Sequence, residues 1–475
     1  MKSRIFKTFL VFGLLSVSLL QAQNEKPNVL FIMVDDMNDW VGAFEGHPQA
    51  ITPNIDKIAK KGVMFKNAYC AAPLCNPSRT SLLTGLRPST TKVYGNSEHF
   101  RDHEGFENVV TLPQHFSANG YQTVASGKIF HSPRGNKPKP KPGSDPGSFQ
   151  EEKLSKLGTR FPEESLRRSH GIDFSRKDMK GTAKKNFDWY PIDDTKEETN
   201  DWQNAEYCAK FLEKEHDKPF FLACGIFRPH LPWYAPKKYF DMYDVDKIEL
   251  PAYLKDDIKD TGSFGNKMKL GLHDELVSKG LWQDAVRAYL ANLTFADDCV
   301  GELINALEKS EYKDNTIIVI MGDHGWHLGE KDIWGKNTLW ERSAKTPLVI
   351  YDPREKGGKA SEEVVSLLDI YPTLVEMCGL PANDKNEGSS IIELVKSPKK
   401  KLNRTAVTSK DEGMHSIRSN RFRYTIYKDG FEELYDHQKD PNEWTNVASD
   451  KAYQKDLEAM RSAMNEKVKL TIKSK

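Results

Sequence analysis

Cys75 lies within the stretch 70–85, which combines a thiol with prolines, a serine and an arginine. Pro77 interrupts regular structure and Gly85 marks a stop, so the stretch predicts a loop that runs into a short helix just after Cys75. The free N–H groups of a helix start favour an anion and lower the pKa of a nearby thiol. Arg79, one turn further on, presents a planar fork of donors to the same anion. The pattern indicates a reactive cysteine, with a buried structural thiol as the alternative.

Asp35 and Asp36 directly follow the continuous apolar run 28–34. Such a run is typical of a central strand in a parallel sheet that is covered on both faces. Two adjacent carboxylates repel each other unless a cation compensates them, and Ca²⁺ or Mg²⁺ prefers oxygen ligands. The pair therefore predicts a metal site at a strand end, with a solvated turn as the alternative.

Three more apolar runs, at 121–125, 219–226 and 316–321, also end in groups that bind anions or move protons, namely Lys128 with His131, His230, and Asp323 with His324. The carboxyl ends of parallel strands meet at one edge of a sheet, where open α/β folds bind their ligands. A lone histidine is usually structural. Four strand ends that carry such groups together indicate a metal-assisted site for a tetrahedral anion.

The elements that must position these groups predict an α/β fold. Residues 284–309 carry an apolar stripe at helical spacing, which is core, and 347–351 read as a fifth strand. After Pro381 the sequence becomes polar and basic. Short strands and a last helix follow, at 421–427, 433–435 and 451–468.

We therefore expect two domains after an export signal. Residues 1–22 have a basic head and an apolar stretch too short to span a bilayer, which is typical of a secretory signal. Residues 23–394 are predicted to form a large domain with a central, mostly parallel sheet between helices. Residues 395–475 are predicted to form a small C-terminal α+β domain. The protein is expected to be exported, periplasmic or secreted, with no membrane span.

Charge and cysteine content narrow the function classes. The net charge of the chain is +1, so no global field attracts nucleic acid. A predicted surface insertion at 133–185 is locally basic, with 14 Lys/Arg against 7 Asp/Glu over residues 134–185. It either contacts an anionic ligand or is merely solvated. The six cysteines match no metal or disulfide spacing, although one disulfide remains possible.

Three motifs resemble signatures of the type I, formylglycine-dependent sulfatases. They are Cys75-x-Pro-Ser-Arg79, Gly127-Lys128-x-x-His131 and Gly322-Asp323-His324-Gly325. The resemblance runs from about residue 27 to 380 and is strongest to the iduronate-2-sulfatase-like branch, through the segment 321–330. It implies an alkaline-phosphatase-like fold for the large domain.

The resemblance also implies residue roles. Cys75 would be oxidised to formylglycine by a maturation enzyme, and one Ca²⁺ would be held by Asp35, Asp36, Cys75, Asp323 and His324. The sulfate oxygens would be neutralised by Arg79, Lys128 and Lys336. His230 would protonate the leaving alcohol, and His131 would deprotonate the second hydroxyl of the hydrated aldehyde.

The expected substrate is a sulfated carbohydrate, with Trp326 and His327 against the sugar ring because they follow the predicted ligands Asp323 and His324. Three alternatives remain open at this point. One is a phosphodiesterase or phosphonate hydrolase of the same superfamily, and another is a metal-dependent phosphatase that uses unmodified Cys75. The third is a non-catalytic glycan-binding relative.

Overall fold

The structure is a computed structural model and describes residues 26–131, 145–153, 170–175, 186–268 and 271–468. Its centre is an eight-stranded sheet with the order β12-β2-β11-β8-β1-β6-β3-β4. The four strands that were predicted to end in functional groups are neighbours and parallel: β8 (Thr316–Gly322), β1 (Asn28–Val34), β6 (Phe220–Ile226) and β3 (Gln122–Gly127). The prediction of convergent strand ends is confirmed.

The other strands complete the sheet on both sides. β2 (Val63–Tyr69) and β12 (Lys359–Ser366) are parallel to each other, and β11 (Leu348–Tyr351) pairs antiparallel to both β2 and β8. The sheet is therefore mixed, and mostly parallel as expected. One edge of the sheet is β12, and the other edge is β4 (Glu151–Lys153), which pairs with β3.

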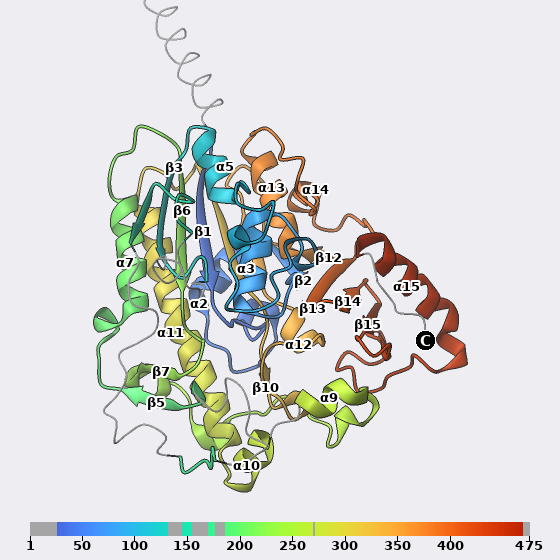
Figure 1. Ribbon diagram of the computed structural model, residues 1–475. Coiled ribbons are helices and arrows are strands. Elements are labelled where there is room, and N and C mark those ends of the chain that lie inside the picture. The colour runs from blue at the N-terminus through green and yellow to red at the C-terminus, as the bar shows by residue number, and fades with distance from the viewer. Residues whose placement is uncertain (1–25, 132–144, 154–169, 176–185, 269–270, 469–475) are drawn as a thin grey trace, which may run out of the picture.

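Helices cover both faces of the sheet (Figure 1). Alternate residues of β1 enter two separate cores, with Leu30 and Ile32 in one and Val29 and Phe31 in the other. The first core is closed by α2 (Pro53–Lys61), α7 (Asn200–Leu212) and α11 (Trp282–Lys309). The second is closed by α3 (Cys75–Thr84), α5 (Leu112–Ala118) and α13 (Ile370–Met377). Burial on both faces explains why the strand is apolar throughout.

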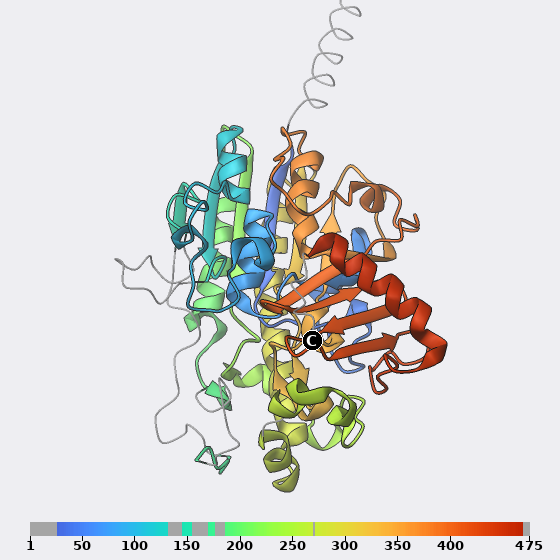
Figure 2. The same cartoon turned by 45° about the vertical axis from the view of Figure 1, so that its right-hand side comes forward.

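A four-stranded antiparallel sheet follows the large domain, as predicted for a small α+β unit. It consists of β13 (Ala406–Asp411), β14 (Met414–Arg418), β15 (Phe422–Ile426) and β16 (Glu432–Asp436). Figure 2 shows α15 (Gln454–Lys467) across one face of this sheet, where Leu457, Met460 and Met464 join its core.

This unit is tied directly to the loop before Cys75. The Thr408 hydroxyl on β13 donates to the Cys70 carbonyl at 2.7 Å, and the Ser409 N–H donates to the Ala71 carbonyl at 2.8 Å. The second sheet thus holds the backbone that leads into α3, the helix that begins at Cys75.

The remaining helices and strands lie in the connections: α4 (Pro88–Thr91), β5 (Trp189–Ile192), β7 (Trp233–Pro236), α8 (Lys237–Phe240), α9 (Gly262–Met268), α10 (Leu272–Ser278), β9 (His327–Leu328), β10 (Trp334–Gly335), α12 (Glu341–Ala344) and α14 (Ile392–Lys396). Among the described residues, no helix is long and apolar enough to cross a membrane.

The structure describes the six cysteines in full and the predicted insertion in part. The insertion 133–185 was predicted to be a long surface loop, and residues 151–153 within it form β4, which adds an edge strand to β3. Most of the other insertion residues, and the predicted signal at 1–22, lie outside the described residues. All six cysteines are described, buried and free, so no disulfide forms between them.

Candidate active site

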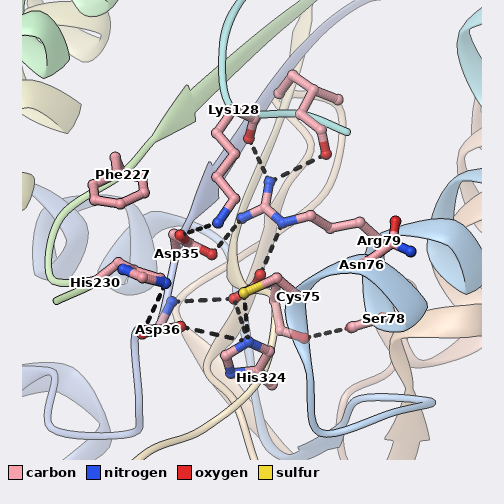
Figure 3. Close-up of polar contacts among 12 residues, drawn as sticks. Asp35, Asp36, Cys75, Asn76, Ser78, Arg79, Lys128, Phe227, His230 and His324 are labelled. Carbon is pink, nitrogen blue, oxygen red and sulfur yellow. Dashed lines mark hydrogen bonds and ion pairs between the residues drawn. The ribbon is translucent and has the colours of Figure 1, made fainter. Parts of the chain in front are cut away.

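Asp35, Asp36 and Asp323 follow the carboxyl ends of β1 and β8, and all three are fully buried. Figure 3 shows Asp35 and Asp36 in the same site as Cys75 and His324. The Asp36 N–H donates to Asp323 Oδ1 at 3.1 Å, so the two strand ends are linked through a carboxylate. Asp36 has a φ of 60°, which turns the chain sharply after Asp35. The Tyr289 hydroxyl on α11 donates to the Asp36 carbonyl at 2.9 Å and fixes this turn.

Arg79 and Lys128 neutralise these carboxylates from the other side of the site. Arg79 donates to Asp323 Oδ2 at 2.8 Å and to Asp35 Oδ1 at 3.0 Å, and it also donates to the Lys128 and Ile129 carbonyls. Lys128 Nζ donates to Asp35 Oδ2. Burial alone would raise the pKa of Asp35, but Lys128 and Arg79 hold it well below its ordinary value. Four of the five N–H donors of Arg79 are therefore used by the protein itself.

Cys75 lies between Lys336 and His324. Lys336 Nζ is 2.8 Å from Cys75 Sγ and also donates to Asp36 Oδ1, whereas His324 Nε2 is 3.4 Å from the sulfur. Burial and then Asp35 raise the pKa of the Cys75 thiol. The sequence prediction of a lowered thiol pKa is therefore wrong, because desolvation and carboxylates outweigh the neighbouring lysines.

The start of α3 differs in one respect from expectation. Cys75 is the first helical residue, and the next N–H group, that of Asn76, donates to Asn96 Oδ1 at 3.0 Å. Pro77 has no N–H, and the Ser78 N–H bonds to the Leu74 carbonyl. The helix start therefore offers fewer free donors to an anion than the sequence suggested. Asn96 carries no motif that marks it as part of this site.

His230 follows β6 and reaches the same site. Its Nε2 is 3.9 Å from Asp36 Oδ2, and its Nδ1 is 2.6 Å from the Leu231 carbonyl. A proton on Nδ1 therefore bonds to that carbonyl and directs Nε2 toward the carboxylates. Burial, and then Lys336, keep the pKa of His230 well below its ordinary value.

The turn that carries His230 is held by two residues that the sequence did not mark. Asp201 on α7 accepts hydrogen bonds from the Phe227 and Arg228 N–H groups at 2.8 and 3.1 Å. Arg228 is fully buried and donates to the His230 carbonyl at 2.7 Å. The Phe227 ring lies 4.5 Å from the His230 ring and 5.2 Å from Lys128 Nζ. Each is a single residue outside any motif, so only the fold reveals it.

His131 follows β3 and is the last described residue before the gap at 132–144. Burial first, and then Lys128, lower its pKa to about 3. Its buried Nδ1 has no hydrogen-bond partner within the described part of the chain. The neighbouring charges that act on it, Lys128 and Asp35, belong to the site, which agrees with the predicted location.

Trp326 and His327 do not lie as the sequence suggested. His327 is fully buried, its Nε2 is 2.9 Å from the Thr338 hydroxyl, and its ring packs edge-on against Trp340. Trp326 is 3% exposed, and Lys336 Nζ lies 5.3 Å from the centre of its ring. The expected sugar contact of His327 is wrong in this geometry, and Trp326 supports Lys336 from within the core.

The cluster suits a hard divalent cation. Ligand atoms of Asp35, Cys75, Asp323 and His324 lie within 4.8 Å of one another, and Asp36 belongs to an overlapping group. Asp36 Oδ2 is buried and has no hydrogen-bond partner among the described residues. Burial raises the pKa of Asp36 to about 7, with Asp35 adding to the increase and Lys336 opposing it. A bound cation would give Asp36 Oδ2 a partner and would lower the pKa of Asp36. Carboxylate oxygens favour Ca²⁺ or Mg²⁺.

His324 is oriented for the same role. Its Nδ1 is 3.0 Å from the Gly325 carbonyl, and a proton on Nδ1 satisfies that oxygen. Nε2 is left facing Asp36 Oδ1 and Asp323 Oδ1, each at 3.5 Å. This is the arrangement of a metal-binding histidine whose other nitrogen is held by a carbonyl.

The fold places possible metal-binding groups beside a cysteine at the carboxyl edge of a mostly parallel sheet, and family comparison gives the class of protein. The Sulfatase family model matches residues 27–380, and the model for the N-sulphoglucosamine sulphohydrolase C-terminal region matches residues 329–470. The chain belongs to the sulfatase family and is a sulfuric ester hydrolase.

Two curated relatives and one solved structure illustrate the relationship. A sulfatase of Formosa agariphila is 36% identical over 456 residues, covering 94% of this chain and 87% of the relative. Human iduronate 2-sulfatase is 30% identical over 403 residues, covering 74% of this chain and 69% of the relative. The phosphonate monoester hydrolase of Agrobacterium radiobacter shares the fold, with a TM-score of 0.74 and 23% identity over 93% of this chain and 95% of that one.

Proposed function

We propose that the protein is an exported sulfatase that hydrolyses sulfate esters of a sulfated carbohydrate. The observation that carries this proposal is the arrangement around Cys75, where three buried carboxylates and three cationic side chains surround one sulfur atom. In the proposal, Cys75 is oxidised to formylglycine by a maturation enzyme, and one Ca²⁺ is held by Asp35, Asp36, Asp323 and His324 beside position 75. Formylglycine supplies the hydroxyl that attacks sulfur, and Ca²⁺ polarises the sulfate.

The lysines bind the sulfate oxygens in this proposal. Lys336 lies 2.8 Å from Cys75 Sγ, and its side chain is 9% exposed, so it contacts the position of the proposed nucleophile and is not fully buried. Burial alone would lower the pKa of Lys336, but Asp36 and the other acidic groups raise it above its ordinary value. It therefore remains a cation at neutral pH, which suits charge stabilisation in a water-poor site.

Arg79 acts mainly through other side chains, because four of its five N–H donors are already used. It bonds to two of the three carboxylates and to two carbonyls. We assign it the role of holding Asp35 and Asp323 in place, so it is a positioning residue for the cation site. This differs from a direct sulfate contact, which the motif alone suggested.

Two histidines are assigned the proton transfers. His230 Nε2 faces the site and lies on the opposite side of Asp36 from Lys336, where it would protonate the leaving alcohol. His131 lies next to Lys128 and has a free Nδ1 among the described residues, which suits the deprotonation that releases sulfate. The low pKa of His230 means that a bound substrate anion must raise it before this residue acts as an acid, whereas the low pKa of His131 leaves it neutral, as a base requires.

The carbohydrate part of the proposal is supported by the name of one relative. Iduronate 2-sulfatase, at 30% identity, is named for a sugar acid, and the sequence carries the same branch resemblance at 321–330. The predicted signal at 1–22 supports export. The similarity to a phosphonate monoester hydrolase is a similarity of fold, so that activity is kept as the competing reaction to be measured.

The test compares sulfate release with phosphonate monoester hydrolysis for the purified enzyme and for Cys75→Ala. We expect sulfate release from an aryl sulfate and from at least one sulfated sugar, at a higher kcat/KM than for a phosphonate monoester. Cys75→Ala should reduce both to background with an unchanged circular dichroism spectrum. Appreciable turnover by Cys75→Ala, or a preference for the phosphonate, would refute the proposal.

A further inference from the structure

A second basic site lies far from Cys75, on the outer strands of the large domain. A cavity of about 380 Å³ opens between β2, the start of β12 and the segment that leads to the second sheet. Two glutamates, Glu362 and Glu363, line it together with five lysines, namely Lys66, Lys359, Lys399, Lys400 and Lys401. We call this site the lysine groove.

The two lining glutamates neutralise only part of the positive charge of the lysine groove. Glu363 is 1% exposed, and its carboxylate accepts hydrogen bonds from the Leu402 N–H at 3.0 Å and from Asn420 at 3.1 Å. It is 3.8 Å from Lys401 Nζ, and that lysine side chain is 69% exposed. Glu363 therefore serves the backbone of the connecting segment.

The remaining lysines keep an excess of positive charge. Lys66 is 3.4 Å from Glu362, and Lys400 is 2.7 Å from Glu393. Lys359 and Lys399 are exposed and have no ion-pair partner within the described part of the chain. Lys396 precedes the run 399–401, whereas Arg404 after the run is already paired with Asp369 at 2.6 Å.

The location excludes a role in the reaction itself. Lys359 pairs with Val63 at the amino end of β2, whereas Ser366 pairs with Tyr69 at the carboxyl end, where the active site lies. β2 has 7 residues, so the two ends are roughly 20 Å apart. A ligand that occupies both sites must therefore be an extended chain.

We propose that the lysine groove is a non-catalytic binding site for a sulfated glycan chain, which keeps a polymeric substrate on the enzyme between turnovers. This inference rests on the proposed function, since it takes the polymer form of the same substrate class. Flexible lysines that act as point charges suit sulfates spread along a chain. The groove lining contains no aromatic residue on which bases would stack, so the observations favour a sulfated glycan over a nucleic acid.

The test measures binding of dextran sulfate to the full chain in the Cys75→Ala background, so that the polymer stays intact. The groove variant carries Lys359→Gln, Lys399→Gln and Lys401→Gln. Each exposed contact is worth a factor of about two. We therefore expect about tenfold weaker binding at low salt, and a smaller difference as salt rises.

A matched control removes three lysines elsewhere. Lys237, Lys238 and Lys247 have side chains that are 61%, 54% and 79% exposed, and we expect their replacement by Gln to leave dextran sulfate binding unchanged. Equal losses in both triple variants would show that only net charge matters and would overturn the inference. Equal affinity of the parent for single-stranded DNA, lost equally in the groove variant, would overturn it as well.

Activity of the enzyme with native Cys75 separates this inference from the proposed function. The groove substitutions should leave kcat/KM for a small aryl sulfate unchanged and raise KM for the polymer. If no sulfate ester were cleaved while the groove variant still lost dextran sulfate binding, the proposed function would fail and the groove would stand. If sulfate esters were cleaved and groove binding were unaffected by the substitutions, only the inference would fail.

Discussion

Two buried clusters in this protein both combine acidic, basic and histidine side chains. They differ in whether their carboxylate oxygens have hydrogen-bond partners among the described residues. The active-site cluster gathers Asp35, Asp36 and Asp323 with three cationic side chains around Cys75. The second lies where the small sheet meets the large domain, and we call it the interface cluster: Glu341, Arg418, Arg423, His437 and Glu443. Both contain groups of acidic and histidine side chains close enough to bind a metal.

The interface cluster is internally satisfied. Glu443 accepts from Arg423 at 2.6 Å and from the Glu341 N–H at 2.8 Å, and Glu341 accepts from the Tyr69 hydroxyl at 2.8 Å. Burial would raise the pKa of Glu443, but Arg423 and His437 lower it to about 2. Two arginines already occupy the place that a cation would take.

The active-site cluster is not satisfied in this way. Asp36 has an unbonded buried oxygen and a pKa raised to about 7 by burial, although Lys336 contacts its other oxygen. The comparison teaches that buried charge alone does not mark a functional site. An unsatisfied carboxylate beside a potential nucleophile does, because folding tolerates such a defect only where ligand binding repairs it.

The largest effect is expected from a substitution in the active-site cluster. Asp323→Asn removes one of the charged ligands proposed for Ca²⁺ and one partner of Arg79. We expect kcat/KM for sulfate release to fall by about 10²-fold or more, and calcium affinity to fall with it. Calorimetric titration of the metal-free variant measures the affinity. An unaltered titration curve would contradict the metal assignment.

The second-largest effect is expected from a substitution in the interface cluster. Glu443→Gln removes one of the two carboxylates that pair with the buried Arg423, the other being Glu341, so we expect the free energy of unfolding to fall by about 2 kcal/mol. Calcium affinity should be unchanged, since the Glu443 carboxylate bonds to the Glu341 N–H, Arg423 and His437, and no active-site residue is among its hydrogen-bond partners in the described part of the chain. Urea unfolding and the same titration measure both quantities. A loss of calcium affinity as large as that of Asp323→Asn would erase the distinction between the clusters.

The smallest effect is a pH dependence of the interface cluster. The pKa of Glu443 is depressed in the folded state, so its stabilisation is present above the ordinary glutamate pKa and is lost as pH falls toward about 2. We expect about 1 kcal/mol to be lost by roughly pH 3.5. Comparing the wild type with Glu443→Gln isolates this contribution, because the variant should lack this part of the acid dependence. Identical pH profiles would contradict the assignment.

The strand ends could be predicted from the sequence because each apolar run is buried on both faces and closes on polar residues. Four such runs fix one edge of a parallel sheet, and the sheet then brings Asp35, Lys128, His230 and Asp323 together without further information. The helix that starts at Cys75 was visible from its proline and glycine signals, to within one residue.

Tertiary contacts explain what the sequence could not predict. His327 follows two predicted ligands in sequence, yet it turns into the core toward Thr338 because the chain bends after β8. The thiol pKa was misjudged because burial cannot be read from a motif. Asp201 accepts hydrogen bonds from two backbone N–H groups and Asn96 from one, all of them on other segments of the chain, and no local pattern predicts such contacts.

The central claim is that catalysis depends on a converted Cys75 at the unsatisfied cluster. The most direct measurement is the mass of the Cys75 peptide in preparations made with and without a co-expressed maturation enzyme, each assayed for sulfate release. The account predicts that activity rises in proportion to the fraction of the peptide that carries formylglycine, which is lighter than cysteine. Full activity in a preparation whose Cys75 is entirely unmodified would contradict it.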